Sequence, residues 1–304
     1  MRISTNTMFD GATARLGQLQ SSMDRTVQQL DSRKRLLTAA DDPAAASRVL
    51  DVEQATASNT QYKSNRTNVR NSLSVVDGAM NSMLDSLQVI HEQVVGAGNG
   101  ALSESDMSIM AQALQGQFDQ LKSQINSRDA SGNYLFSGYQ TDKPPFADDG
   151  SGQLRYQGDQ GQQLVAVDDS RKLAMSEAGS VLLPDDQDGA NIFNRLQSAI
   201  AALQPGQDQA VRQSALTALG SSYASTLSSV TRSQASVGTR LNELEQLDMR
   251  GSDREVEYAA ISSSLQDLDY TKSLSDLSRQ QLVLQAAQKT FQQVSGLSLF
   301  NYIS

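Results

Sequence analysis

Apolar residues between positions 52 and 94 recur at alternating steps of three and four residues. Thirteen positions follow this spacing and eleven of them are apolar, whereas the overall hydrophobic content of 38% would give about five. These positions are Val52, Ala55, Asn59, Tyr62, Arg66, Val69, Leu73, Val76, Met80, Met83, Leu87, Ile90 and Val94. So long a heptad seam is typical of helices that pack side by side along their length.

The ends of this helix are marked by local signals. Asp42 is a suitable N-cap and Pro43 suits the first helical position, while the run Gly96 to Gly100 (GAGNG) ends the helix and lets the chain turn back. At ~1.5 Å per residue the helix would be roughly 78 Å long, against a diameter of about 50 Å for a compact globule of this length. The pattern therefore predicts a rod.

Three further helices are expected in the rod. The first is capped by Ser103 and carries one apolar face, formed by Met107, Met110, Leu114, Phe118, Leu121 and Ile125. A short helix is expected from Ile192 to Leu203. A long helix in the second half has a seam with one polar exception, Gln234, and the apolar members Leu227, Val230, Val237, Leu241 and Leu244.

Both ends of the chain are also amphipathic. The first segment has an apolar stripe interrupted by Thr26 and Arg33, and the last has one interrupted by Gln280. We expect the two segments to pair as an antiparallel coiled coil, which gains order when other subunits cover it, because a lone two-helix contact buries little area. The candidate assembly interface is Leu16, Leu19, Met23, Leu30, Leu37, Leu277, Leu284, Ala287, Phe291 and Val294.

The five prolines separate a segment of different character. Residues 44–143 and 206–304 contain no proline, whereas residues 141–190 hold three prolines, six of the 20 glycines and a net charge of −6. Within this insert, Leu154 to Tyr156 and Leu164 to Val167 flank the turn-rich sequence QGDQGQ, which predicts a β-hairpin.

The expected fold is mainly α, an elongated antiparallel helical rod with paired terminal coiled-coil helices and a small β-rich insert. It divides into three parts: a terminal assembly domain (1–40 with 268–304), a helical rod domain (41–140 with 191–267) and an acidic β-rich insert domain (141–190).

Composition removes most chemical functions. The chain has no Cys and one His, so disulfides, thiol nucleophiles, Cys-ligated zinc and multi-histidine sites are excluded. A net charge of −9 disfavours nucleic-acid binding, which needs clustered cations. His91 lies on the flank of a seam, and Asp41 with Asp42 is interpreted as a turn and cap before Pro43. No catalytic residue, cofactor or metal is expected.

The acidic run Asp185 to Gly189 (DDQDG) suggests a calcium loop at first sight. Aligning Gly189 with the sixth position of an EF-hand loop places Pro184 first and Arg195 twelfth, where carboxylates belong. We interpret the run as a solvated acidic loop. Residues 1–10 lack the charged and apolar regions of a cleaved secretory signal, and no stretch reaches the ~20 apolar residues of a membrane span, so no membrane insertion is expected.

Four motifs resemble the bacterial flagellin superfamily. They are RISTNTMF at the start, LLTAADDPAAASRVL over residues 36–50, GNYLFSGYQTDKPPF over residues 132–146 and SGLSLFNYIS at the end. Within the superfamily, Pro43 after the paired aspartates, the YLFSG block and the neutral ending resemble the hook-filament junction proteins rather than filament flagellin. The resemblance covers about 250 residues, with a weak match in the insert.

The resemblance implies a structural, non-enzymatic subunit, exported by the flagellar type III apparatus and located outside the cell at the junction of hook and filament. It implies that copies form a ring, with the terminal helices as an inner tube, the rod outside it and the insert projecting outward. The implied partners are other copies, the other hook-filament junction protein, flagellin and an export chaperone. The subunit would support flagellin polymerisation and motility.

Two other interpretations stay open on the sequence. The chain could be a filament flagellin, which copy number and the effect of deletion would distinguish. It could also be a cytosolic or secreted coiled-coil interaction protein with a fortuitous flagellar resemblance, which fractionation of sheared flagella would distinguish.

Overall fold

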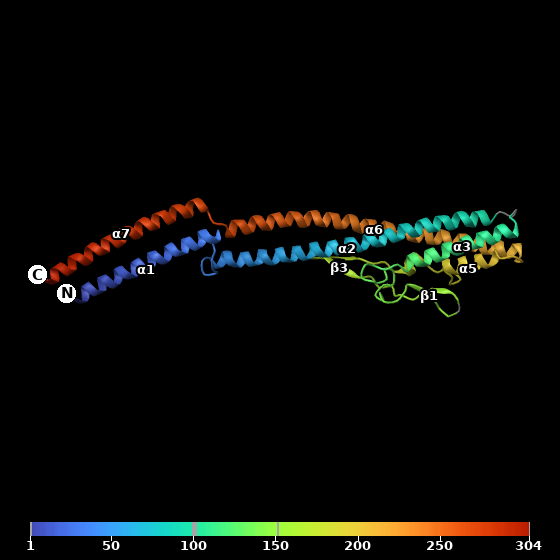
Figure 1. The fold of residues 1–304 in the computed structure, drawn as a ribbon, viewed down its shortest axis with the longest axis horizontal. Helices are drawn as coiled ribbons and strands as arrows, with labels where there is room; N and C mark the ends of the chain where they lie inside the picture. Colours follow the sequence, from blue (N-terminus) through green and yellow to red (C-terminus); the bar gives the residue numbers. More distant parts are fainter. Residues whose placement is uncertain (1, 99–101, 151, 304) are drawn as a thin grey trace. The chain divides into compact units, whose positions relative to one another are not determined.

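Residues 2–98, 102–150 and 152–303 are described by a computed structural model of the chain (Figure 1). The helices are α1 (Arg2–Ser32), α2 (Pro43–Ala97), α3 (Glu104–Ile125), α4 (Gly179–Leu182), α5 (Ile192–Ala202), α6 (Gln209–Gln266) and α7 (Tyr270–Ile303). Short strands lie between α3 and α4, namely β1 (Phe146–Asp148), β2 (Leu154–Tyr156), β3 (Leu164–Asp168) and β4 (Arg171–Ala174). The predicted mainly α fold is confirmed.

The chain divides into two compact units. Unit 1 is Met1–Ser58 with Asp253–Ser304, and unit 2 is Asn59–Ser252. Unit 1 therefore contains α1, α7, the start of α2 and the end of α6, whereas unit 2 contains the rest of α2 and α6 together with all four strands.

Helix α2 begins where its cap residues predict. The Asp42 carboxylate accepts a hydrogen bond from the Ala45 N–H at 3.0 Å, and Pro43 is the first helical residue. The helix ends at Ala97, inside the glycine-rich run, of which Asn99 and Gly100 lie outside the described residues.

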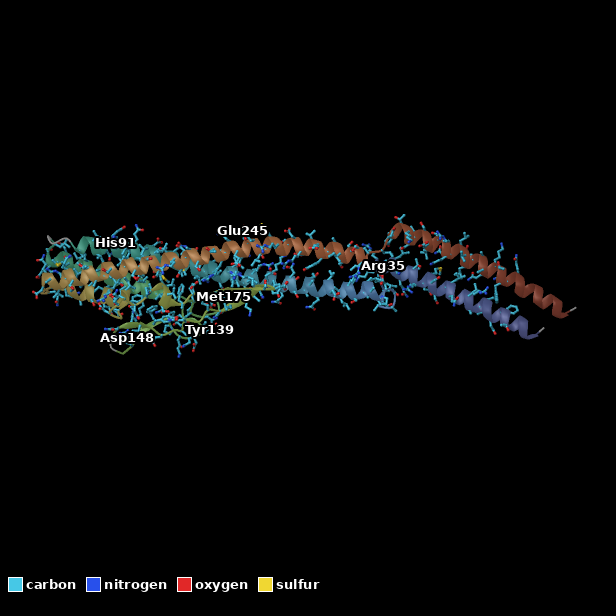
Figure 2. All side chains as sticks on the ribbon, turned by 180° about the vertical axis from the view of Figure 1, so that it is seen from behind. Arg35, His91, Tyr139, Asp148, Met175 and Glu245 are labelled. Carbon is cyan, nitrogen blue, oxygen red and sulfur yellow. The ribbon has the colours of Figure 1, made fainter. Side chains whose placement is uncertain are left out.

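The predicted seam of α2 forms the core of unit 2. From Val69 to Val94 its eight members are at most 8% exposed and belong to one contiguous cluster. Helices α2 and α6 run antiparallel here: the His91 ring stacks on Tyr223 with centroids 4.5 Å apart, and Gln234 donates to Asn81 at 2.7 Å. His91 (Figure 2) thus has a packing role on the flank of the seam.

Helices α3 and α5 complete this core. The Ser103 hydroxyl accepts from the Asp106 N–H at 3.2 Å in a capping box, which confirms the predicted start of α3. Phe193 of α5 is fully buried and meets Phe118 of α3 and Phe146 of β1, each at 5.5 Å between ring centroids. Aromatic edges from three elements therefore close the core.

The seam of α6 differs from the prediction. Thr226 and Ser233 are at most 7% exposed, while their neighbours Leu227 and Gln234 are only half-buried. The prediction followed the large apolar residues and placed Leu227 and Gln234 in the seam, where the structure has Thr226 and Ser233. Small hydroxyl side chains can occupy a seam where the opposing helix supplies long side chains, since packing density depends on the summed volume.

The predicted pairing of β2 with β3 is wrong. Strand β1 pairs with β2, and β3 pairs with β4, both antiparallel. The sequence between β2 and β3 does not form a hairpin turn because Asp159 is held elsewhere. Its N–H donates to the Ser137 carbonyl at 3.2 Å, and its carboxylate accepts from the Tyr139 N–H at 2.9 Å.

The insert is anchored to α2 and α6 by arginines. Arg66, with a side chain 2% exposed, donates to Asp248 of α6 at 2.5 Å and to the Val167 carbonyl of β3 at 3.0 Å. Arg171 of β4 makes two bonds to Glu243, at 2.6 and 2.8 Å. The buried guanidinium of Arg66 and the exposed one of Arg171 therefore fix β3 and β4 against the helices.

The acidic loop before α5 is closed by its own contacts. The Asp186 carboxylate accepts from the backbone N–H groups of Asp188 and Ala190, at 2.9 and 3.0 Å, and from Arg195 at 2.7 Å. These donors lower the pKa of Asp186, against the opposing effect of burial. Among the described residues, no group of three or more His, Asp or Glu side chains could hold a metal ion.

Candidate assembly surface

Helices α1 and α7 pack against each other as an antiparallel pair within unit 1. The rings of Phe9 and Phe291 meet edge to face at 5.7 Å, and the Tyr270 hydroxyl donates to the Leu30 carbonyl at 3.3 Å. The residue numbers of both pairs add to the same value, as a straight antiparallel register requires. The same register sets Leu284 opposite Leu16.

Most of the sequence-predicted interface residues lie along this contact and are half-buried. Leu30 is the most covered, at 8% exposed, and the side chain of Val294 lies outside those described. The half-buried members on the two helices are Leu16, Leu19, Met23, Leu277, Leu284, Ala287 and Phe291. Two helices alone thus cover only part of each side chain, and the rest of its surface is available to a further neighbour.

Leu37 lies outside α1. The helix ends at Ser32 because Arg33 adopts a left-handed backbone, with φ 57°, and the stripe does not continue as helix beyond this residue. Leu37 instead lies in the link to α2, where its N–H donates to Asp41 at 2.8 Å.

Two of the three polar interruptions of the stripes, Thr26 and Gln280, lie within the helix pair, whereas Arg33 lies beyond the end of α1. Thr26 is 8% exposed, and its hydroxyl donates to the Ser22 carbonyl of the same helix at 3.0 Å. Gln280 is half-buried, with its side-chain oxygen inaccessible and without a hydrogen-bond donor among the described residues. A half-satisfied polar group in the contact weakens a pair that is already thinly covered.

Backbone hydrogen bonds join the two links that adjoin the helix pair, residues 33–42 between α1 and α2 and residues 267–269 between α6 and α7. The Arg35 N–H donates to the Gln266 carbonyl at 2.7 Å, and the Leu268 N–H donates to the Arg33 carbonyl at 3.2 Å. The Arg35 guanidinium (Figure 2) also donates to the Leu265 carbonyl at 2.8 Å. The basic cluster Arg33 to Arg35 therefore has a structural role in joining the two links.

Asp41 and Asp42 organise the first link, which supports their interpretation as turn and cap residues. The backbone N–H groups of Thr38 and Leu37 lower the pKa of Asp41, and Arg25 adds a smaller effect. The Ala45 N–H lowers the pKa of Asp42 in the same way. Both carboxylates are therefore held in the charged form that the link and the helix start require.

Several exposed apolar residues of the helix pair escaped the sequence analysis. Leu274 is 55% exposed, Leu282 68% and Val283 43%. These residues lie on a different face of α7 from the seam, and the sequence analysis considered only the residues at seam spacing. Apolar residues outside the seam spacing of an amphipathic helix could have indicated them.

A hollow of about 270 Å³ lies in unit 2, between α2 and the loop that follows α3. Hydroxyl, amide and apolar side chains line it, the apolar ones including Val75, Val76 and Met175, with one carboxylate, Asp129. This carboxylate already accepts from the N–H groups of Ser131 and Asn133, at 2.8 and 2.9 Å. The hollow thus presents neither a carboxylate pair nor a nucleophile beside a base.

Comparison with known proteins identifies the family. The sequence model of a protein family, the bacterial flagellin N-terminal helical region, matches residues 3–141. The chain is 34% identical to flagellar hook-associated protein 3 of Salmonella typhimurium and 33% identical to that of Escherichia coli. Each alignment spans 316 residues and 99% of both chains.

Solved structures agree. A putative flagellar hook-associated protein from Vibrio parahaemolyticus has a TM-score of 0.70 and 26% identity, covering 75% of this chain and 100% of that one. The flagellar junction protein FlgL from Legionella pneumophila shares the fold, with a TM-score of 0.59 and 19% identity, over 72% of this chain and 100% of that one.

In the described part of the chain, no helix is both long and apolar enough to cross a membrane.

The identity over the full length, the shared fold and the terminal helix pair lead to one conclusion. The chain belongs to the flagellar hook-associated protein 3 family of the extracellular bacterial flagellum.

Proposed function

We propose that this chain forms the ring that joins hook to filament and supports flagellin polymerisation, and that motility depends on it. The observation that carries the proposal is the α1 and α7 pair. Most of its described seam residues stay half-buried in one chain, whereas the equivalent α2 residues of unit 2 are buried. A stripe of this kind is stabilised when neighbours cover it.

Assembly then proceeds by burial of apolar surface, without chemistry. The ten interface residues named from the sequence contribute by covering one another across copies, and we regard residues 1–40 with 268–304 as the assembly part. Residues 41–140 with 191–267 would form the surrounding rod, and residues 141–190 the outer insert. No enzymatic activity, cofactor, nucleic acid or membrane insertion is part of the proposal.

The proposed partners follow from the position at a junction. They are further copies of the chain, the other hook-filament junction protein on one side, flagellin on the other, and an export chaperone before assembly. The names of the relatives support association with the flagellar hook. Filament flagellin remains the alternative function, and a coiled-coil interaction protein the second.

Localisation on intact flagella tests the proposal. Immunogold labelling should give one band at the hook-filament boundary, and a deletion strain should shed monomeric flagellin while keeping its hooks. Label along the whole filament would support a filament flagellin. Absence of label from flagella would favour a coiled-coil protein with another role.

A point variant tests the assembly surface. Leu284→Ala should cost about 2–5 kcal/mol where the site is buried in the ring, so that less protein is retained on flagella. Gln285→Ala is the matched control, since Gln285 is the exposed neighbour on the same helix. Equal retention of the two variants would contradict the assignment of Leu284 to the interface.

A further inference from the structure

The charge of unit 1 is divided along its length. Residues 1–35 with 270–304, the terminal pair, carry nine basic and four acidic residues, a net charge of +5. Residues 36–58 with 253–269, the acidic base, carry two basic and nine acidic residues, a net charge of −7. A terminal pair of positive charge is unusual in a chain whose total is −9.

The positive charge of the terminal pair faces outward. Arg15, Lys272, Arg279 and Lys289 are all exposed, and Arg279 has a side chain 76% exposed with a single weak ion pair at 4.0 Å, to Asp276. Apolar residues accompany these cations, above all Leu282 at 68% exposed, together with Leu274 and Val283. The outer face therefore combines cations with uncovered apolar side chains.

The acidic base has the opposite charge and a similar apolar content. Asp51, Glu53 and Glu257 are exposed, and they lie in sequence beside Leu50, 65% exposed, and Val256, 71% exposed. On α6, the exposed Asp253 and Glu257 flank Val256 on one face of the helix, so this face presents an apolar side chain between charges of one sign. This face and the outer face of the terminal pair are complementary in both respects.

The two surfaces of one chain cannot neutralise each other over most of their length. Lys289 lies nineteen residues beyond the start of α7 at Tyr270, which is about 28 Å along a helix at ~1.5 Å per residue. The Debye length at physiological salt is only about 8 Å. An oppositely charged surface must therefore come from another molecule.

We propose that the terminal pair of one copy docks on the acidic base of a neighbouring copy. The Arg279 and Lys289 side of α7 lies against the Asp253 and Glu257 face of α6 in that neighbour, and Leu282 is covered beside Val256. This inference rests on the proposed ring. It adds a direction to assembly, because charge complementarity excludes pairing of like surfaces and steers the approach.

Charge exchange in the full-length chain tests the docking. Arg279→Glu with Lys289→Glu, and separately Asp253→Lys with Glu257→Lys, should each lower the protein retained per flagellum about tenfold. The quadruple variant restores complementarity and should recover to within about threefold of the unchanged protein. Arg232→Glu is the control, since Arg232 is an exposed arginine of unit 2.

The quadruple variant separates this inference from the function itself. The docking is overturned if the unchanged protein labels the junction and the quadruple variant folds normally by circular dichroism, yet retention of that variant does not recover. The proposed function stays intact in that case. Absence of the unchanged protein from the junction overturns both.

Cysteine crosslinking gives a second measurement that does not depend on charge. The chain has no cysteine, so Lys289→Cys with Glu257→Cys creates a clean reporter pair. Oxidation of isolated flagella should give a species of two linked copies, absent from either single variant. Crosslinks only to a different protein, or none at all, would contradict the docking of copy on copy.

Discussion

Units 1 and 2 use the same heptad pattern with different results. In unit 2 the α2 seam meets α3, α5, α6 and the strands, and residues such as Leu73, Met80 and Leu87 are fully buried. In unit 1 the described buried residues are Thr26, Leu30 and Ala45. The stabilisation from a heptad seam therefore depends on how much of it other elements cover, since burial energy follows the apolar area removed from water.

The largest expected effect compares two phenylalanines. Phe193→Ala in unit 2 removes a ring that contacts two other rings and should lower the free energy of unfolding by about 3–5 kcal/mol. Phe291→Ala in unit 1 removes a half-buried ring and should cost the free chain about 1 kcal/mol. Urea unfolding measures both, and equal costs would contradict the contrast between units.

The next prediction concerns Arg66 of unit 2 and the acceptors of its guanidinium. A Cβ at Gly251 would lie 2.4 Å from the Arg66 guanidinium, so Gly251→Ala must displace a side chain tied to Asp248 and β3. We expect a loss of about 1–3 kcal/mol in thermal or urea unfolding. Gly238→Ala is the matched control, because nothing lies within 4 Å and it should be neutral or slightly stabilising.

A smaller gain is expected in unit 1. Arg33→Gly removes a side chain from a left-handed backbone and should stabilise the ordered terminal pair by about 1 kcal/mol or less. Limited proteolysis of the free chain should then cut the termini more slowly. Arg33→Ala keeps the Cβ and serves as the control; slower cutting in this variant as well would assign the effect to the lost charge.

The smallest effect is a dependence on pH. The pKa of Asp41 is lowered from its ordinary value of 3.8 by link N–H groups, so its contribution is complete above that value and is lost as the pH falls through the lowered value. Helical signal from unit 1 should therefore decrease below about pH 4. Asp41→Asn should show less of this dependence between pH 5 and pH 2 by circular dichroism, and an unchanged profile would contradict the role of Asp41.

Local signals predicted much of the fold. The caps at Asp42 and Ser103, the α2 seam and the antiparallel terminal pair were all visible in the sequence, because caps and heptads depend on residues close along the chain. The sequence predicted that β2 pairs with β3, but in the structure β2 pairs with β1 and β3 pairs with β4. Asp159 is held by Ser137 and Tyr139, some twenty positions away, and no local pattern records that contact.

Helical periodicity depends only on spacing, so the residues that share a helix face can be assigned from the sequence. The sequence also determined the charge of every segment. The number of elements that cover each face depends on the tertiary structure, which explains why Met80 is fully buried while Leu284 is half-buried at an equivalent seam position. The tertiary structure likewise decided that Arg66, a polar exception in the heptad, joins α2, α6 and β3, because its acceptors lie about 100 and 180 residues away.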